Sequence, residues 1–509
     1  MGQALASDTP VAIVGAGAMG SGIAQVAAAA GHRVLLYDAS SGAVEQAIAR
    51  IGASFDRLAE KGRIDAGAAQ AARARLIPAA RLDELAASGL LIEAIVEDLV
   101  AKQQLFRTLE AIVSPACLLA TNTSSISVTA IAAALSAPGR LAGMHFFNPV
   151  PQMTLVEVIS GLATEALVAD TLHATALAWG KSPVRARSTP GFIVNRVARP
   201  YYGEALRLLN EGAADCATLD AVFRNAGGFR MGPFELMDLI GLDVNLAVSR
   251  SVWSAFFNDP RYAPSPIQQE MVAAGFLGRK SGRGFYPHAP AATMPQAGNL
   301  EPQPIPCSLH IFGNCPLASA LSERLQVRGL TFQHAPASPD GRLAEAGGAA
   351  IYLTDGRSAS ERGARSGVAN TVLVDLALDY GSATRLAIAT AEQCHAAAAT
   401  AAVGLLQAAG FTVSRLADVP GLALMRTVCM LANEAADAVY QNVCTAAAVD
   451  QAMRLGTNYP LGPLAWGERI GLPLVHSVLT NLATSYGEDR YRASPLLARK
   501  VFSGKKFHV

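Results

Sequence analysis

The sequence predicts an α/β domain of the doubly wound kind, followed by an all-α domain, a small degenerate α/β insert and a second copy of the all-α domain. Three observations support this architecture. A glycine-rich turn follows the first apolar run, short apolar runs alternate with helical segments up to residue 187, and a late block of sequence repeats an earlier one. A chain of 509 residues also exceeds what one hydrophobic core usually organises.

The first predicted domain covers residues 8–187. Its apolar runs, each the length of a short strand, are Val11–Val14, Val34–Tyr37, Leu90–Ile95, Leu118–Thr121 and Leu141–Phe146. Segments of helical composition separate these runs, and such alternation builds βαβ units. The domain is therefore expected to be α/β with a mostly parallel sheet.

Residues 188–287 form the second predicted domain, which is helical. Glu204–Leu209 and Asp220–Ala226 are among its helical segments. Residues 288–306 are rich in Pro, Ala, Gln and Asn and have little periodicity, which is typical of a linker.

Residues 307–410 form the third predicted domain, a small α/β unit. Strand-like runs at Ser308–Phe312, Ala349–Leu353 and Thr371–Leu376 are separated by Ala-rich helical segments. Because this part of the chain has no Gly-x-Gly-x-x-Gly turn, we expect it to bind no dinucleotide.

Residues 411–509 repeat the helical domain. A shift of the numbering by 230 makes these residues meet without an insertion: Pro190-Gly191 and Pro420-Gly421, Arg196 and Arg426, Glu204 and Glu434, Asp220 and Asp450, Gly232-Pro233 and Gly462-Pro463, Ile240-Gly241-Leu242 and Ile470-Gly471-Leu472. The agreement indicates an internal duplication. Asn195 of the first copy is Met425 in the second, so chemistry that needs this amide survives only in the first copy.

The charge balance excludes several classes of partner. Lys and Arg number 41 and Asp and Glu 40, which gives a formal net charge of +1, and no long run of one sign occurs. Neither nucleic acid nor an anionic membrane is therefore expected as a partner.

The uncharged stretch Val11–Gly31 is about as long as a membrane span and lies near the start of the chain. Glycines interrupt it and no Lys or Arg precedes it, so neither a membrane helix nor an export signal is predicted. The expected location is cytoplasmic, where the seven cysteines would stay reduced. None of them forms a C-x-x-C pair, so no metal site is expected.

A cofactor site is predicted near residue 15. Gly15-Ala16-Gly17-Ala18-Met19-Gly20 follows the first apolar run and opens a helix. Its glycines permit a tight turn and let backbone N–H groups approach a pyrophosphate, as in Rossmann-type domains. The second run ends at Asp38, whose carboxylate can accept hydrogen bonds from the adenine ribose and repel the 2′-phosphate of NADP. No Arg or Lys follows at once, so NAD is the expected cofactor.

Two residues suited to proton transfer come later. His145 lies in Gly143-Met144-His145-Phe146-Phe147-Asn148-Pro149, and Glu157 lies in the next apolar run. Oxidation of a secondary alcohol needs a hydride acceptor at carbon and a base at oxygen, and imidazole can take that proton near neutrality. A carboxylate on the other ring nitrogen would fix the tautomer and stabilise the imidazolium. Spacing alone leaves a structural histidine beside two phenylalanines as an equally good interpretation.

Four motifs occur in order: Gly15–Gly20, Asn122-Thr123-Ser124-Ser125, His145-Phe146-Phe147-Asn148-Pro149 and Pro190-Gly191-Phe192-Ile193-Val194-Asn195-Arg196. Together they resemble the 3-hydroxyacyl-CoA dehydrogenase family. The resemblance implies a Rossmann-type NAD domain and a helical domain like that of 6-phosphogluconate dehydrogenase. Two helical copies around a degenerate insert resemble the long bacterial dehydrogenases of phenylacetate degradation, which act on 3-hydroxyadipyl-CoA, 3-hydroxybutyryl-CoA or related thioesters.

The resemblance also implies catalytic roles. His145 would be the general base and Glu157 its partner, while Ser124 and Asn195 would hydrogen-bond the reacting oxygen and the thioester end of the substrate. A hydroxyl and an amide can polarise a carbonyl without competing for the proton that the imidazole shuttles.

Binding roles follow from the same resemblance. Glu97, Lys102, Ser124 and Asn148 would contact NAD, although sequence alone favours a solvated helix pair for Glu97 and Lys102. Ser54 and Lys61, seven apart and so on one helical face, match family positions that bind coenzyme A.

The resemblance predicts a reversible NAD-dependent oxidation of (S)-3-hydroxyacyl-CoA to 3-oxoacyl-CoA, within acyl-CoA, fatty acid or phenylacetate catabolism. One alternative keeps the fold but takes a free hydroxy acid or a sugar acid, as gulonate dehydrogenases do. Another is a non-enzymatic dinucleotide-binding protein. The tandem copies permit either a homodimer or a monomer with an internal pseudo-dimer of helical domains.

Overall fold

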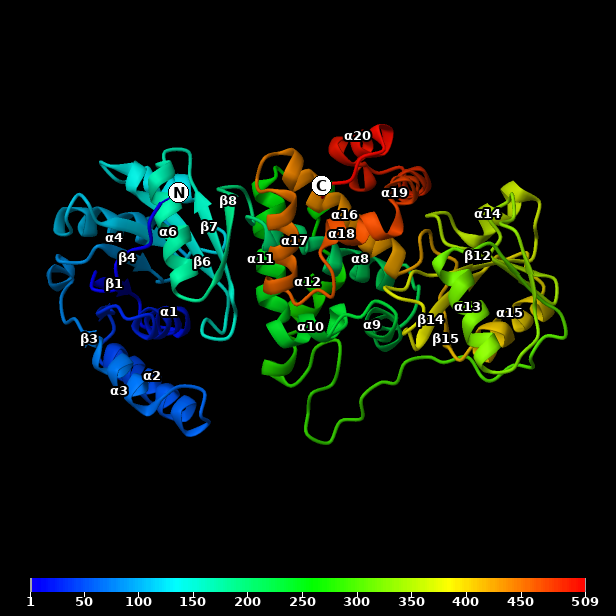
Figure 1. Ribbon diagram of the computed structural model, residues 1–509, viewed down its shortest axis with the longest axis horizontal. Helices are drawn as coiled ribbons and strands as arrows, with labels where there is room; N and C mark the ends of the chain where they lie inside the picture. The colour runs from blue at the N-terminus through cyan, green and yellow to red at the C-terminus, as the bar shows by residue number, and fades with distance from the viewer. Residues whose placement is uncertain (1, 509) are drawn as a thin grey trace. The chain divides into compact units, whose positions relative to one another are not determined.

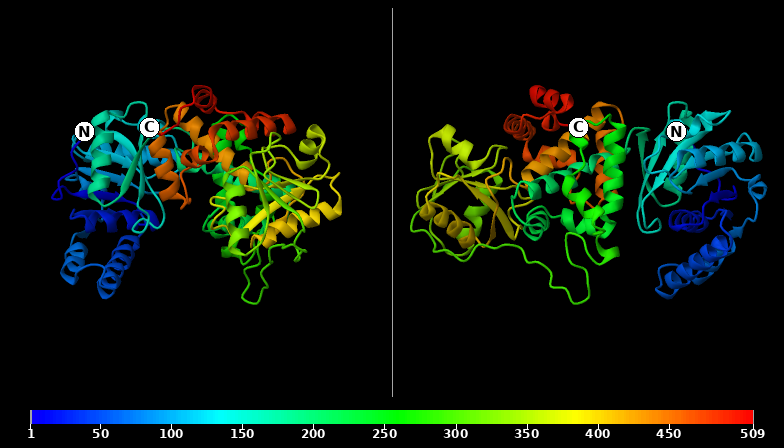
Figure 2. Two further views of the ribbon diagram at one scale, coloured as in Figure 1. Left: turned by 45° about the vertical axis from the view of Figure 1, so that its right-hand side comes forward. Right: turned by 180° about the vertical axis from the view of Figure 1, so that it is seen from behind.

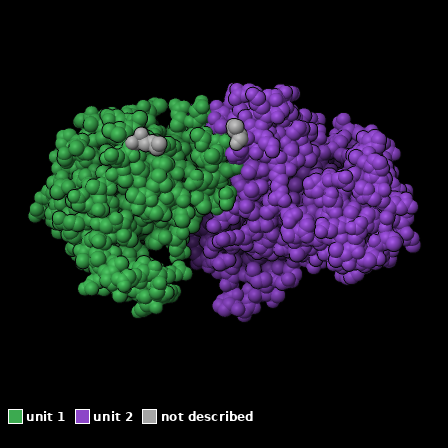
Figure 3. All heavy atoms as spheres, viewed as in Figure 1, with its two compact units in different colours: residues 1–196, 441–457 green, residues 197–440, 458–509 purple. Residues whose placement is uncertain are grey.

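The computed structural model describes residues 2–508 (Figure 1). The chain divides into two compact units, coloured separately in Figure 3. Unit 1 comprises residues up to 196 together with 441–457, and unit 2 comprises residues 197–440 together with those from 458 onward.

Unit 1 is built around one sheet. In its described residues the strand order is β3-β2-β1-β4-β5-β6-β7-β8, and only the β6–β7 pair is antiparallel. The strands are β1 (Val11–Val14), β2 (Val34–Tyr37), β3 (Leu76–Pro78), β4 (Leu90–Glu93), β5 (Leu118–Thr121), β6 (Leu141–Phe146), β7 (Leu155–Ser160) and β8 (Ser182–Arg187). The helices are α1 (Ala18–Ala29), α2 (Ala43–Glu60), α3 (Ala66–Ala74), α4 (Leu99–Ile112), α5 (Val128–Ala132), α6 (Ala166–Ala178), α7 (Val194–Val197) and α17 (Ala446–Gly456), with 3-10 turns at Leu82–Leu85 and Pro138–Arg140.

The predicted α/β architecture of this unit is confirmed, and four of the five predicted runs coincide with strands. The exception is β4, which ends at Glu93 instead of continuing to Ile95. The Glu93 carboxylate accepts hydrogen bonds from the Ile95 N–H at 2.8 Å and from the Lys102 ammonium at 2.5 Å. The Ala94 N–H still donates to the Val14 carbonyl of β1, but the Glu93 side chain takes the Ile95 N–H, so the strand pairing does not continue.

Helices α2 and α3 form a hairpin that extends away from the sheet (Figure 2). Asp65 begins α3 and caps it by accepting the N–H groups of Gly67 and Ala68. Along α2 one face is buried and the opposite one is exposed, so the hairpin presents a long polar surface to solvent.

Unit 2 contains most of both helical copies. The first copy has α8 (Arg199–Asn210), α9 (Cys216–Asn225), α10 (Pro233–Ile240), α11 (Leu242–Ala255) and α12 (Pro266–Ala273), and the second has α16 (Leu424–Tyr440), α18 (Pro463–Ile470), α19 (Leu472–Tyr486) and α20 (Pro495–Ser503). Short 3-10 turns lie at Pro260–Tyr262, Arg279–Ser281 and Asp489–Tyr491. Both helical segments predicted for the first copy lie in helices, α8 and α9, although α9 ends one residue early.

Buried ion pairs join the two copies within unit 2. Glu204 of α8 accepts hydrogen bonds from Arg426 of α16 at 2.7 Å and from Arg490 at 2.9 Å. At the equivalent position of the second copy, Glu434 accepts from Arg261 and from the Tyr262 hydroxyl of the first copy. Each copy therefore neutralises a buried carboxylate of the other, as two subunits of a symmetric dimer would.

The predicted third domain corresponds to a second sheet within unit 2, whose strand β15 lies beyond residue 410. Its order in the described residues is β10-β9-β11-β12-β13-β14-β15. The strands are β9 (Leu309–Phe312), β10 (Gln333–Ala335), β11 (Ala344–Ala346), β12 (Ala349–Leu353), β13 (Thr371–Val374), β14 (Arg385–Thr390) and β15 (Thr412–Arg415), and the helices are α13 (Pro316–Val327), α14 (Ala359–Ser366) and α15 (Ala396–Ala408). The last predicted run ends at Val374 and not at Leu376. The Asp375 N–H still donates to the Ala387 carbonyl of β14, but the Asp375 carboxylate accepts the Leu376 N–H.

The repeat extends further back than its sequence signal. The shift of 230 also relates the first residues of β7 and β14, of α6 and α15, and of β8 and β15. Strand β13 pairs with β14 in the antiparallel register in which β6 pairs with β7. The second half thus repeats the end of the first sheet, with Asp375 in the place of His145 and Ala387 in the place of Glu157.

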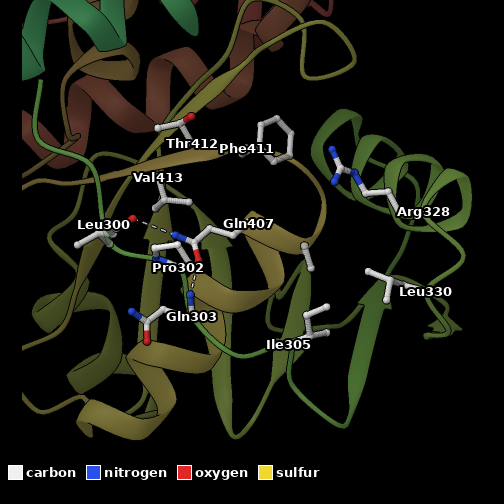
Figure 4. Close-up of a pocket in the computed structure, with 11 residues that line it drawn as sticks. Leu300, Pro302, Gln303, Ile305, Arg328, Leu330, Gln407, Phe411, Thr412 and Val413 are labelled. Carbon is white, nitrogen blue, oxygen red and sulfur yellow. Dashed lines mark hydrogen bonds between the residues drawn. The ribbon is translucent and has the colours of Figure 1, made fainter.

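The extended segment before β9 is held against the second sheet. The Gln407 side chain donates to the carbonyls of Leu300 and Glu301 and accepts the N–H of Gln303. Beside these bonds lies a pocket of about 560 Å³, whose wall includes Arg328 and Phe411 (Figure 4). No residue of the predicted cofactor, catalytic or coenzyme A sites lines it.

Within residues 2–508, every helix is too short or too polar to cross a membrane. The same residues contain no group of three or more His, Cys, Asp or Glu side chains arranged to hold a metal ion.

Candidate active site

The glycine-rich turn has the geometry that a dinucleotide requires. Gly15 has a φ of 109°, and a Cβ there would lie 2.4 Å from the Ala94 carbonyl oxygen. A Cβ on Gly20 would lie 1.8 Å from the Gly15 carbonyl oxygen, whereas one on Gly17 would meet open space. Helix α1 begins directly after Gly17 and has no acidic residue in its first turn. The turn is therefore closed on the protein side and open where a pyrophosphate would meet the helix N-terminus.

Asp38 is fixed at the end of β2. Its Oδ2 accepts the Ala16 N–H at 2.7 Å and its Oδ1 accepts the Ser40 N–H at 2.8 Å. Burial acts to raise the pKa of this carboxyl, but the two N–H donors outweigh it and the pKa lies below its ordinary value. An ionised carboxylate beside the glycine turn fits the ribose hydroxyls of NAD and disfavours a 2′-phosphate.

His145 and Glu157 form a buried pair. They are directly opposite each other in the antiparallel register of β6 and β7, and His145 Nδ1 lies 2.6 Å from Glu157 Oε2. Glu157 Oε1 accepts the N–H groups of Ile193 at 2.9 Å and Val194 at 3.0 Å. Because a carboxylate only accepts, Nδ1 carries the hydrogen and Nε2 is the nitrogen that can take a proton.

Aromatic rings border the imidazole. The ring centroids of His145 and Phe147 are 4.5 Å apart, and Phe192 lies at 6.0 Å. Only 6% of His145 is exposed, and Glu157 is fully buried. Such a setting limits water around the pair and strengthens the electrostatic interaction between them.

Ser124 and Asn195 lie together in unit 1. The Asn195 side-chain amide donates to the Ser124 carbonyl at 3.4 Å, although the two residues are 71 positions apart. Glu97 holds the same loop, because its Oε1 accepts the Thr123 hydroxyl at 2.6 Å and the Ser124 N–H at 3.0 Å. The loop that carries Ser124 is therefore fixed by an acid from the loop between β4 and α4.

Lys102 differs from the solvated residue that sequence alone favoured. Its side chain is 1% exposed, and its ammonium lies 2.5 Å from Glu93 and 3.3 Å from Glu97. The solvated-pair interpretation was wrong, because a lysine can be buried where two carboxylates neutralise it. Glu97 is the more exposed of the pair, with 37% of its side chain exposed.

A pocket of about 190 Å³ lies between α1, α2 and the loop after β6. Arg50 and Ile51 of α2 line one side of it, and Asn148 lines the other. Ser54 follows one turn later and accepts a hydrogen bond from Gln25 at 3.1 Å, while Lys61 lies at the exposed end of α2. The predicted coenzyme A residues thus continue along the helix that borders this pocket.

The second half has no equivalent catalytic pair. Asp375, in the place of His145, accepts the N–H groups of Ala423, Leu424 and Met425. Ala423 and Leu424 are the counterparts of Ile193 and Val194, which hold Glu157. Burial raises the pKa of Asp375 to about 6, against the effect of these N–H donors. Asp375 stands where the first half has an imidazole, and no carboxylate stands where it has Glu157. This position therefore lacks an imidazole base held by an acid.

Sequence reasoning did not single out several residues that shape the site. Glu93 holds Lys102, and the Asn122 side chain accepts the Phe146 N–H at 2.9 Å, next to His145. Acids and amides at the ends of consecutive parallel strands were the available signal, since these ends share one edge of the sheet.

A dinucleotide turn, an ionised acid at the end of the second strand and a buried imidazole–carboxylate pair define an NAD-dependent dehydrogenase. Residues 10–189 match the model described as "3-hydroxyacyl-CoA dehydrogenase, NAD binding domain", and residues 191–288 and 421–507 match that family's "C-terminal domain". The chain belongs to the 3-hydroxyacyl-CoA dehydrogenase family. Residues 351–420 match a "3-hydroxybutyryl-CoA dehydrogenase reduced Rossmann-fold domain".

Individual relatives agree with this assignment. The chain is 44% identical over 498 residues to 3-hydroxyadipyl-CoA dehydrogenase of Escherichia coli. The aligned residues cover 96% of this chain and 97% of that protein. A crystal structure of 3-hydroxybutyryl-CoA dehydrogenase from Escherichia coli matches with a TM-score of 0.89 at 43% identity, over 98% of this chain and 99% of that one. The (S)-3-hydroxybutyryl-CoA dehydrogenase of Ralstonia eutropha matches with a TM-score of 0.54 at 41% identity, over 55% of this chain and 99% of that one.

The position of Asp38 leads to a prediction about cofactor choice. In Asp38→Asn the charge that opposes a 2′-phosphate is lost, so we expect kcat/KM to rise about 10–100-fold for NADP and to fall about 10-fold for NAD. Steady-state kinetics with both cofactors measure the ratio of kcat/KM for NADP to kcat/KM for NAD. Glu45→Gln, which removes an exposed acid from the first turn of α2, should leave the ratio unchanged. An unchanged ratio in Asp38→Asn would contradict the role given to this carboxylate.

Proposed function

We propose that this chain oxidises the 3-hydroxyl group of (S)-3-hydroxyacyl-CoA to a ketone, reversibly, with His145 as the general base and Glu157 as its partner. The observation that carries the proposal is the buried pair, with Nδ1 held 2.6 Å from the acid and Nε2 left to accept a proton. The family supplies the substrate class, since its members are named for 3-hydroxyacyl-CoA thioesters.

The residues divide the chemistry between them. When bound, NAD supplies the acceptor for the hydride that leaves the carbinol carbon. His145 Nε2 takes the hydroxyl proton as the carbon–oxygen double bond forms, and Glu157 stabilises the resulting imidazolium. Ser124 and Asn195 are proposed to hydrogen-bond the reacting oxygen and the thioester carbonyl. Glu97, Lys102 and Asn148 are proposed as cofactor contacts.

The proposal extends to the acyl group and the coenzyme portion of the substrate. Ser54 and Lys61 are assigned to coenzyme A, because they continue along α2 from the pocket that Asn148 lines. An ammonium at the exposed end of that helix suits a phosphate. The relatives are named for 3-hydroxyadipyl-CoA and 3-hydroxybutyryl-CoA, so both acyl groups are proposed substrates, in phenylacetate or fatty acid catabolism.

The test compares acetoacetyl-CoA with acetoacetate by following NADH absorbance. We expect kcat/KM to be at least about 100-fold higher for the thioester, because binding energy from the remote coenzyme contributes to the transition state. Lys61→Ala should reduce this preference without changing the rate for acetoacetate. Equal rates for the two substrates would favour a free hydroxy acid or sugar acid dehydrogenase, and NADH binding without any turnover would favour a non-enzymatic protein.

We also propose a monomer with an internal pseudo-dimer, in the cytoplasm. The reciprocal ion pairs of Glu204 and Glu434 within unit 2 support the first part. All seven cysteines are unpaired thiols, which suits a reducing compartment. A homodimer of this chain is the alternative that a mass measurement in solution would detect.

A further inference from the structure

Helix α17 comes from the second helical copy but belongs to unit 1 (Figure 3). It packs against β7 and β8, the two strands at the edge of the first sheet. The Arg187 N–H donates to the Val443 carbonyl at 2.9 Å, and the Arg196 guanidinium donates to the Gln441 side chain at 2.9 Å. Residues 441–457 are therefore bonded to the part of the chain that holds Glu157.

Gly456, the last residue of α17, lies against Leu155 and Val194, two residues close to Glu157. A Cβ on Gly456 would lie 2.7 Å from Leu155 Cδ2 and 3.1 Å from Val194 Cγ2. Leu155 precedes Glu157 by two residues in β7, and Val194 donates its N–H to the Glu157 carboxylate. Both side chains are buried, so neither has open space into which it could move.

Position 456 requires a residue without a side chain because space is lacking, and not because the backbone conformation needs glycine. Gly456 does not have a positive φ, so any residue could adopt its backbone conformation. The charge of Glu157 also affects the thiol of Cys444, near the start of the same segment. Burial raises the pKa of its thiol to about 12, and the negative charge of Glu157 adds to the increase.

The first helical copy makes the equivalent contact in unit 2. Helix α9, which the shift of 230 relates to α17, packs against β14, the counterpart of β7. The Leu378 N–H donates to the carbonyl of Ala226, the residue that corresponds to Gly456. Each helical copy thus lends one helix to the sheet of the other half, but only α17 meets a sheet that carries a histidine–glutamate pair.

We infer that α17 is part of the catalytic unit and that Gly456 is a positioning residue, which keeps Glu157 in place through Leu155 and Val194. This inference rests on the proposed role of Glu157. The second helical copy would then be required for catalysis, and not only for stability, because it completes the packing around the acid of the first half.

The test introduces a side chain at position 456 and then makes room for it. In Gly456→Leu we expect kcat to fall about 10–100-fold, with both KM values within about two-fold of wild type, because a displacement of an ångström is enough to impair proton transfer. Gly456→Ala should show a smaller fall. Adding Leu155→Ala to Gly456→Leu should restore kcat to within about three-fold of the Leu155→Ala variant.

Ala226→Leu is the matched control, since it places the same side chain at the equivalent position of the other half. Its thermal unfolding should change as in Gly456→Leu, while its kcat per folded molecule stays close to wild type. A wild-type kcat in Gly456→Leu, no rescue by Leu155→Ala, or an equal fall in Ala226→Leu would each overturn the inference. If Gly456→Leu does not fold, Gly456→Ala with and without Leu155→Ala decides. An inactive wild type, or a fully active His145→Ala, would instead refute the proposed function.

Discussion

Replacing His145 by alanine is expected to lower turnover by roughly 10²–10⁴-fold while NADH still binds. The imidazole is the group that can accept the hydroxyl proton, and Glu157, which remains, is fully buried and already holds two N–H groups. The variant therefore keeps the dinucleotide turn and loses the base. NADH fluorescence measures binding, and absorbance with acetoacetyl-CoA measures turnover.

His32→Ala controls for the loss of a buried imidazole. His32 is 2% exposed, bonds the Thr9 carbonyl through Nδ1 and packs against Trp179 in the same unit. Its removal should lower thermal stability and leave turnover per folded molecule unchanged. Near wild-type turnover in His145→Ala would remove this histidine from the mechanism.

Replacing Glu204 by glutamine is expected to destabilise unit 2 by about 3–5 kcal/mol at pH 7. Glu204 is fully buried and accepts hydrogen bonds from Arg426, Arg490 and the Tyr491 hydroxyl. Glutamine keeps the shape but leaves two buried guanidinium groups without this counter-charge. Urea unfolding followed by tryptophan fluorescence, to which Trp466 contributes from its buried place in the same unit, measures the loss.

The pH dependence of this loss has a definite sign. Burial acts to raise the pKa of Glu204, but Arg490 and Arg426 outweigh it and lower the pKa from 4.5 to about 2. A carboxyl with a lowered pKa stabilises the folded state above its unfolded pKa, and this contribution disappears as the pH falls through the folded value. The difference between wild type and Glu204→Gln should therefore shrink as the pH falls below about 4.5 toward 2.

Glu488→Gln is the control for the Glu204 measurement. Glu488 pairs with Arg207 at 2.7 Å, but its side chain is 41% exposed. An exposed ion pair contributes roughly 0–1 kcal/mol, so this variant should unfold close to wild type. A loss in Glu204→Gln that stays constant between pH 7 and pH 3 would show that packing, and not charge, is the cause.

Much of the fold could be predicted because the apolar runs are short and bounded by turns. Strands β1, β2, β5 and β6 occupy the predicted residues. The errors at β4 and β13 share one cause, since in both a carboxylate within the predicted run, Glu93 or Asp375, accepts the N–H of a later residue of that run. Composition does not reveal such local capping. The domain boundaries at residues 187, 287, 306 and 410 stay predictions.

The candidate site was predicted in part. Sequence identified His145 and Glu157, but the register of β6 and β7 that makes them neighbours is a property of the folded sheet. The N–H groups of Ile193 and Val194 could not be found, because backbone donors leave no mark on residue type. The segment 441–457 could not be placed in unit 1 either, since that contact joins residues far apart in the chain.

Asp375 makes it hard for the second half to gain a histidine–carboxylate pair in evolution. A change of Asp375 to histidine would take away the acceptor of the Ala423, Leu424 and Met425 N–H groups, and the new imidazole would face Ala387 and find no acid there. Either of the two necessary changes, made first, lowers stability without restoring a base. Descendants of this gene are therefore expected to keep one working centre for every two copies of the helical domain, however long they diverge.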